Sequence, residues 1–237
     1  MKARCCFSIR AIRTKNNSQT KRMRVKVNSR LFNLAEALAF SALVALYIWQ
    51  LQAAYKFSWL VFPAWLIASF VLHRDTPKTL GWRADNLWIA SKKSAVVLVP
   101  FGAGLCILGL FLGGLHRPLD HLLAPSRFFG YMFFCLLQQV GLNSCVTNRL
   151  LAADMRPAGA SLIAGTIFAA LHWPNPVLIP LTWIGGCAMA WLFARDRNIF
   201  PLAAGQGILG TIVWWAFPVA WHHAMRVGPG FYHFHPR

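Results

Sequence analysis

The chain has 237 residues, of which 57% are hydrophobic and only 13% are charged. A soluble domain carries about 25% charged residues, so this composition excludes an ordinary soluble enzyme and favours a surface that faces lipid. The 24 Lys and Arg residues far outnumber the 6 Asp and Glu residues, a balance found in nucleic-acid-binding proteins as well as in membrane proteins.

Residues 1–31 form a basic N-terminal segment. Ten Lys and Arg residues precede the first apolar stretch, and no acidic residue accompanies them. This pattern is typical of a disordered cytoplasmic tail that contacts anionic lipid headgroups, and it is too long for the charged part of a cleavable signal peptide. The remaining basic residues lie in short connectors between apolar runs. We therefore predict the lipid bilayer, and no nucleic acid, as the partner.

Seven apolar stretches of spanning length, or nearly so, follow this tail. A membrane-spanning helix needs about 20 mostly apolar residues, whereas a membrane barrel would show short alternating segments. The sequence predicts an all-α, polytopic transmembrane helical bundle of about seven spans, with six to eight possible. Its transmembrane domain is residues 32–221, and residues 222–237 form a short His-containing tail. The predicted spans are approximately 32–53, 57–73, 94–115, 128–149, 157–173, 177–194 and 199–221.

The connectors predict how the bundle is oriented. Segment 74–93 is too polar to span the membrane, and we expect it to be an amphipathic connector on the inner surface. With the N-terminus inside, 19 of the 24 Lys and Arg residues fall on the inner side and five on the outer side. Positive residues are enriched in cytoplasmic loops. The prediction is a multi-pass protein of the cell (inner) membrane with a cytoplasmic N-terminus.

Polar residues gather in the fourth span. Three of them, Gln139, Asn143 and Thr147, are four residues apart and share one face of a helix. In hydrocarbon a polar side chain needs a protein partner or a water-filled cavity. Hydrogen bonding between helices and a functional pocket both explain such a face. The polar residues of this span are Gln138, Gln139, Asn143, Ser144, Thr147 and Asn148.

Two later spans carry further polar residues. The fifth ends in Phe168 and His172, four residues apart and beside Trp173, and the seventh carries Gln206 among glycines. The predicted span limits place His172 near the outer boundary and Gln206 nearer the inner one. The histidines beyond residue 221 are expected to be solvated. The six cysteines have no CxxC spacing, so neither a disulfide nor a structural zinc site is predicted.

These elements resemble the CPBP family, the Abi-type CAAX-protease and bacteriocin-processing intramembrane peptidases. That family carries Glu-Glu-x-x-x-Arg, Phe-x-x-x-His and His-x-x-x-Asn motifs in successive helices, and Leu80-Gly81-Trp82 is similar to the short segment preceding its core. The resemblance covers about residues 75–215. At the three motifs this chain has Gln138-Gln139 with Asn143, Phe168 with His172, and Gln206 with Gly210.

The resemblance implies an intramembrane endopeptidase that acts on a membrane-associated protein or peptide. In the family the first Glu acts on a water molecule, but a glutamine amide does not titrate and cannot be a general base. His172 is then the one candidate base. The resemblance leaves a divalent metal open, although one His is too few for zinc, and no cofactor is predicted. It implies catalytic roles for Gln138, Gln139, Asn143, His172 and Gln206, and substrate binding by Phe168 and Trp173.

Because the motifs are degenerate, two alternatives remain. The first is a catalytically inactive relative that binds a membrane peptide or partner. The second is a small transporter, although the sequence shows no inverted repeat. Both the peptidase hypothesis and the inactive-relative hypothesis require Gln138, His172 and Gln206 to meet in one polar pocket. A structure can test this requirement.

Overall fold

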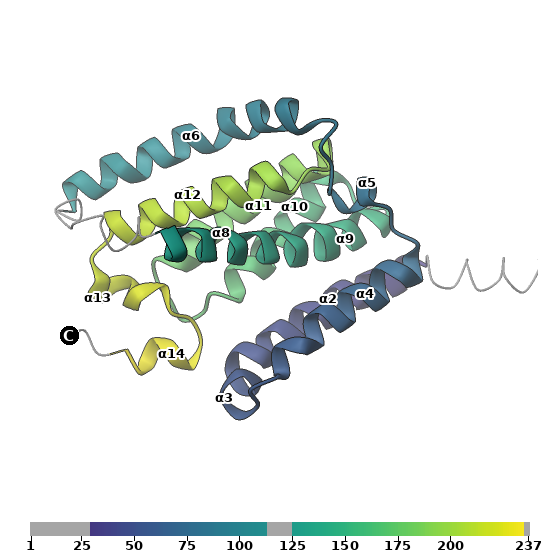
Figure 1. Ribbon diagram of the computed structural model, residues 1–237, viewed down its shortest axis with the longest axis horizontal. Coiled ribbons are helices and arrows are strands. Elements are labelled where there is room, and N and C mark those ends of the chain that lie inside the picture. The colour runs from purple at the N-terminus through teal and green to yellow at the C-terminus, as the bar shows by residue number, and fades with distance from the viewer. Residues whose placement is uncertain (1–28, 113–124, 235–237) are drawn as a thin grey trace, which may run out of the picture.

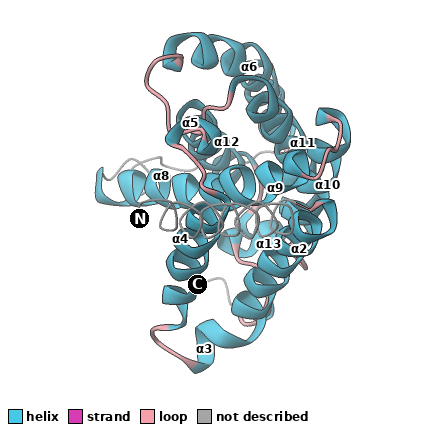
Figure 2. Ribbon diagram, turned by 90° about the vertical axis from the view of Figure 1, so that its right-hand side faces the viewer, coloured by secondary structure: helices cyan, strands magenta, loops and turns pink. Residues whose placement is uncertain are grey.

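The computed structural model describes residues 29–112 and 125–234 (Figure 1). Every regular element in these segments is a helix, and Figure 2 shows no strand in them. Among the described residues, four helices are long and apolar enough to cross a membrane, and two apolar helices are shorter. The predicted class, a helical membrane bundle, is therefore confirmed. The four are Arg30–Ala54, Leu87–Phe111, Arg127–Ala152 and Leu178–Asp196; the shorter two are Ser58–His73 and Pro157–Ala170.

The first two predicted spans form a helical hairpin. Helix α2 (Arg30–Leu46) continues through the π-helical turn η1 (Tyr47–Leu51) into α3 (Gln52–Ala54), and the 3₁₀ turn η2 (Ser58–Leu60) leads into α4 (Val61–His73). Ser29 caps α2 by accepting a hydrogen bond from the Phe32 amide at 3.2 Å, as N-cap serines do. The α3 end of this hairpin projects away from the other helices (Figures 1 and 2).

The connector after α4 is shorter than predicted. It contains α5 (Pro77–Leu80), capped by Thr76, and it ends at Asn86 because α6 (Leu87–Phe111) already begins at Leu87 rather than at 94. Lys92 and Lys93, which were predicted to lie in the connector, lie on α6. The Lys92 ammonium lies 4.7 Å from the centroid of Trp88, and Lys93 Nζ lies 2.5 Å from Asp196 Oδ1.

A long helix with an altered hydrogen-bonding pattern forms the fourth span. It consists of α8 (Pro125–Gln139), the π-helical segment η4 (Val140–Thr147) and α9 (Asn148–Ala152), which follow one another without a break. The π-helical geometry widens the turn and re-aims the side chains that follow it, and such segments recur at functional sites. In this chain it coincides with the predicted polar face.

Helices α10 (Pro157–Ala170) and α11 (Leu178–Asp196) pack tightly against each other. A Cβ atom added to Gly165 of α10 would lie only 2.6 Å from the Cys187 backbone nitrogen, so glycine permits this close approach. Asn175 precedes α11, and its Oδ1 accepts hydrogen bonds from the amides of Val177 and Leu178 at 3.2 and 3.0 Å. These two hydrogen bonds order the turn that leads into α11.

The last predicted span corresponds to α12 (Phe200–Ala216), which stops short of the predicted residue 221. Phe217 is extended (φ −102°, ψ 147°), as expected for a residue that precedes a proline. Three short helices follow. They are α13 (Val219–His222), the 3₁₀ turn η5 (His223–Met225) and α14 (Pro229–Tyr232).

The prediction of a solvated His-containing tail is wrong for His222. This side chain is fully buried, and its carbonyl oxygen accepts a hydrogen bond of 2.8 Å from Asn175 Nδ2. The same amide donates to the Arg226 carbonyl oxygen at 2.9 Å. Asn175 therefore ties the C-terminal segment to the start of α11.

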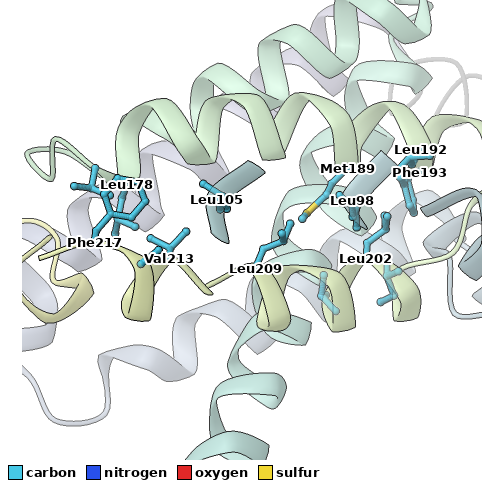
Figure 3. Packing of buried hydrophobic residues seen from close by; sticks show 14 residues of the cluster. Leu98, Leu105, Leu178, Met189, Leu192, Phe193, Leu202, Leu209, Val213 and Phe217 are labelled. Atoms are coloured by element: carbon cyan, nitrogen blue, oxygen red, sulfur yellow. The ribbon is translucent and has the colours of Figure 1, made fainter. Parts of the chain in front are cut away.

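The largest apolar core lies between α6, α11 and α12. Figure 3 shows side chains of these three helices pointing toward one another, and α6 and α12 run side by side along this core (Figure 1). Burying such side chains stabilises the bundle by packing. The core residues labelled in Figure 3 include Leu98, Leu105, Met189, Phe193, Leu202, Leu209 and Val213.

Candidate active site

The predicted polar residues of the fourth span form a chain of amides that crosses to α12. Asn143 Nδ2 donates to Gln139 Oε1 at 2.5 Å, and Gln139 Nε2 donates to Gln206 Oε1 at 2.6 Å. Gln206 Nε2 in turn donates to Gln138 Oε1. Each amide in this chain donates to the next, so the NH₂ group of Gln138 stands at its end as a donor.

The π-helical segment η4 positions this chain. Because the helix is wider here, Thr147 Oγ1 donates to the Leu142 carbonyl, five residues back, at 2.9 Å. Ser144 Oγ donates to the Leu80 carbonyl oxygen at 2.6 Å and so attaches the segment to α5. Gln139 and Asn143 are fully buried. Gln139 joins this helix to Gln206 of α12, whereas Asn143 bonds to Gln139 within its own helix.

Beside the end of the amide chain lies a cavity of about 120 Å³. One water molecule occupies about 30 Å³ in the liquid, so this cavity has room for several waters or for a short stretch of peptide. Its polar lining includes Gln138, Gln206, His172 and Thr182, and aromatic side chains supply much of the remainder. The polar groups therefore meet in an apolar surrounding, where hydrogen bonds are strong.

His172 presents one ring nitrogen for chemistry. Its Nδ1 lies 2.6 Å from the Phe168 carbonyl oxygen. A carbonyl can only accept, so Nδ1–H is the donor and the neutral ring carries its lone pair on Nε2. The ring also packs edge-on against Phe168, with centroids 4.7 Å apart at 75°. Phe168 thus fixes the tautomer and the orientation of His172.

The structure resolves the predicted difference in depth between His172 and Gln206. Helix α10 has 14 residues and is therefore only about 21 Å long, less than the hydrocarbon core of about 30 Å. His172 lies two residues beyond the end of this short helix. It lines the same cavity as Gln206.

The other predicted site residues fall in three places. Phe168 lines the cavity, while Gln139 and Asn143 lie behind it in the amide chain. Trp173 does not belong to the described cavity lining: it is 57% exposed, and its carbonyl oxygen accepts a hydrogen bond from Gly228 at 2.9 Å. The roles assigned to these residues stay predictions.

The sequence analysis did not predict that residues of α11 and Tyr131 line the cavity. Gly185, Gly186 and Met189 of α11 line the cavity, as does Tyr131 of α8. A signal for Tyr131 was available, because it precedes Gln138 by seven residues and so shares its helix face. No local pattern marks the α11 residues, since small and apolar residues are common throughout such spans.

A second polar cluster, also missed, joins the N-terminal hairpin to α9. Arg149 is 1% exposed and its Nη2 donates to Asp75 Oδ2 at 2.6 Å and to Ser69 Oγ at 2.8 Å. Arg149 Nε lies 3.3 Å from Glu36 Oε2, and His73 Nε2 lies 2.5 Å from the same oxygen. Charged residues at membrane depth pair in this way, which was the available signal.

The cavity does not offer a set of metal ligands. A catalytic zinc takes three protein ligands, usually His, Glu, Asp or Cys, and the described cavity lining supplies only His172. Throughout residues 29–112 and 125–234, no three such side chains gather where they could hold a metal. The donor set at the site therefore does not fit a catalytic metal.

Comparison with known proteins gives one family match, which covers part of the chain. Residues 122–212, which carry all three motif positions, match the family model described as Rce1-like, type II CAAX prenyl endopeptidase. No curated protein and no solved structure gives a significant match to the chain. The matched segment contains Gln138, His172 and Gln206, and the predicted resemblance is confirmed. Residues 122–212 of this helical membrane protein thus match a family model of CAAX-protease-like endopeptidases, a match consistent with a CPBP family member.

Proposed function

We propose that the chain is an intramembrane endopeptidase of the CPBP type that acts on a membrane-associated protein or peptide. The observation that carries this proposal is the cavity inside the matched segment, which His172, with its Nδ1 bound to the Phe168 carbonyl, lines together with Gln138 and Gln206. An acceptor and a donor facing one cavity are the minimum that hydrolysis of a peptide bond requires.

In the proposed reaction His172 replaces the carboxylate of the family as general base. His172 Nε2 takes a proton from a water molecule, whose oxygen then adds to the carbonyl carbon of the substrate. The NH₂ group of Gln138 donates to the oxyanion that forms on the carbonyl oxygen. When the C–N bond breaks, the imidazolium returns the proton to the leaving nitrogen. The products are a carboxylic acid and an amine, and His172 is regenerated.

The test uses the full chain reconstituted in liposomes and a quenched fluorescent, prenylated peptide, a substrate class taken from the description of the matching family. Replacing His172→Ala should lower kcat by about 10²–10⁴-fold, the usual contribution of a general base, with a smaller effect on KM. The exposed His233→Ala is the matched control. Unchanged turnover by the His172 variant would overturn the proposal.

A second candidate is a catalytically silent protein that binds the same class of peptide. The observation favouring it is that no carboxylate belongs to the described lining of the cavity. It predicts that the wild-type chain binds the peptide without turning it over. It also predicts that the double change Gln138→Glu and Gln206→His leaves the affinity unchanged; a loss of binding in that variant would argue against it.

A further inference from the structure

The cavity has a second polar position that no motif of the family provides. Tyr131 lines the cavity from α8, and seven residues separate it from Gln138. At 1.5 Å per residue and 100° per residue, the two side chains lie on one face and about 10 Å apart along the helix. The cavity therefore has polar groups at two levels rather than one.

The Tyr131 hydroxyl occupies space that is free only because residue 210 is a glycine. A Cβ atom added to Gly210 would lie 1.9 Å from Tyr131 Oη and 2.9 Å from its Cζ. No side chain at position 210 is compatible with this placement of the ring. Gly210 follows Gln206 by one turn of α12. Helices α8 and α12 therefore meet at two successive places along their interface: Gln138 contacts Gln206 at the first, and Tyr131 lies against Gly210 at the second.

The Tyr131 hydroxyl has a weak hydrogen-bond partner, which a ligand can replace. Its described hydrogen-bond partner is the thiol of Cys135, one turn along α8, and a thiol is a weak partner. The Tyr131 ring stacks with Phe134, with centroids 6.5 Å apart at 29°, and Phe134, which also lines the cavity, is 51% exposed. This end of the cavity therefore lies next to the lipid-facing surface.

We propose that Tyr131 is a substrate-contacting residue that donates its O–H to a backbone carbonyl of the bound peptide, about three residues from the bond held between His172 and Gln138. The spacing follows from the structure, because an extended chain advances about 3.3 Å per residue and the two polar levels are about 10 Å apart. The inference rests on the proposed peptide site, and it makes that site long enough to recognise an extended segment rather than a single peptide bond.

The test measures the affinity of fluorescent prenylated peptides for the liposome-reconstituted chain. One series is lengthened residue by residue before the prenylated cysteine, and a second series after it. Tyr131→Phe removes only the hydroxyl. It should weaken binding about three- to tenfold, the effect of one lost hydrogen bond, for peptides long enough to reach Tyr131 in one of the two series. Shorter peptides should bind the variant and the wild type equally.

Gly210→Ala provides an independent perturbation, since the added methyl displaces the hydroxyl. It should reproduce the length-dependent loss and have no further effect in the Tyr131→Phe background. The matched control is Gly207→Ala on the same seam, where the added Cβ would meet Met132 Sδ at 2.2 Å instead; it should not produce the length dependence.

The outcomes separate this inference from the proposed function. If the wild-type chain binds and His172→Ala abolishes turnover, but Tyr131→Phe has no length-dependent effect, the role of Tyr131 is refuted and the peptidase proposal stands. A loss that is equal for all peptide lengths also refutes it, because a merely structural role predicts that result. If the wild-type chain binds no peptide of either series, both proposals fail.

Discussion

Removing Arg149 should destabilise the protein strongly. The guanidinium is 1% exposed and serves two carboxylates on different segments, Asp75 at 2.6 Å and Glu36 at 3.3 Å. Arg149→Ala leaves both carboxylates buried; Glu36 keeps its contact with His73 Nε2, while Asp75 loses its ion pair and keeps only the electrostatic attraction of Arg197. Breaking a buried ion pair by removing one partner costs about 3–5 kcal/mol, and the loss of Asp75's partner places this variant within that range.

The assay is reversible unfolding of the full chain in mixed micelles, and the measured quantity is the free energy of unfolding. Lys93→Ala is the control, because its pair with Asp196 is half exposed on the lysine side and such surface pairs contribute about 0–1 kcal/mol. Adding Asp75→Asn and Glu36→Gln to Arg149→Ala should restore part of the lost stability. If Arg149→Ala costs no more than Lys93→Ala, the ionic cluster does not anchor the hairpin.

Three further changes test the cavity and the packing around it. Gly185→Leu should abolish peptide binding without loss of stability, because Gly185 lines the cavity and an added Cβ meets no atom within 4 Å. Gly165→Ala should lower the free energy of unfolding by about 1–3 kcal/mol through overpacking, since its Cβ would lie 2.6 Å from the Cys187 backbone nitrogen. Asn175→Ala should cost about 1–3 kcal/mol because buried groups lose their hydrogen-bond partner.

Each of these changes has a matched control. Gly104→Leu adds the same side chain where nothing lies within 4 Å, outside the cavity lining, and should leave peptide binding intact. Gly159→Ala brings a Cβ no closer than 3.7 Å to Met155 and should be neutral. Gln52→Ala removes an exposed side-chain hydrogen bond and should change stability little. Equal effects in variant and control would contradict the corresponding prediction.

The helices could be predicted from the sequence because hydrocarbon demands long apolar segments. Each of the seven predicted spans corresponds to a helical segment among the described residues, although residues 113–115 of the third lie outside them and the seventh is interrupted at Phe217. Their ends were less accurate, since an end depends on contacts made across the bundle. Lys92 and Lys93 look like connector residues in isolation, yet Trp88 and Asp196 compensate their charges and extend α6 to Leu87.

The site could be predicted only in part, for a related reason. The spacing within motifs places Gln138, His172 and Gln206, and the structure brings these three side chains to one cavity. The spacing of Tyr131 from Gln138 places both on one helix face, but the position of the Tyr131 ring also depends on the absence of a side chain at Gly210 of α12. Glu36 forms its ion pair with Arg149, which lies more than a hundred residues away in the sequence. No local sequence pattern predicts such a pairing.

The shortness of α10 has a consequence for the surrounding bilayer. Helices of 14 residues, such as α10, are about 21 Å long and leave a mismatch of several ångströms with a hydrocarbon core of about 30 Å. A bilayer adapts to such a mismatch by thinning locally. The headgroup layer beside α10 would then dip toward His172. Water and the polar part of a substrate could thus reach the cavity without crossing the full apolar layer.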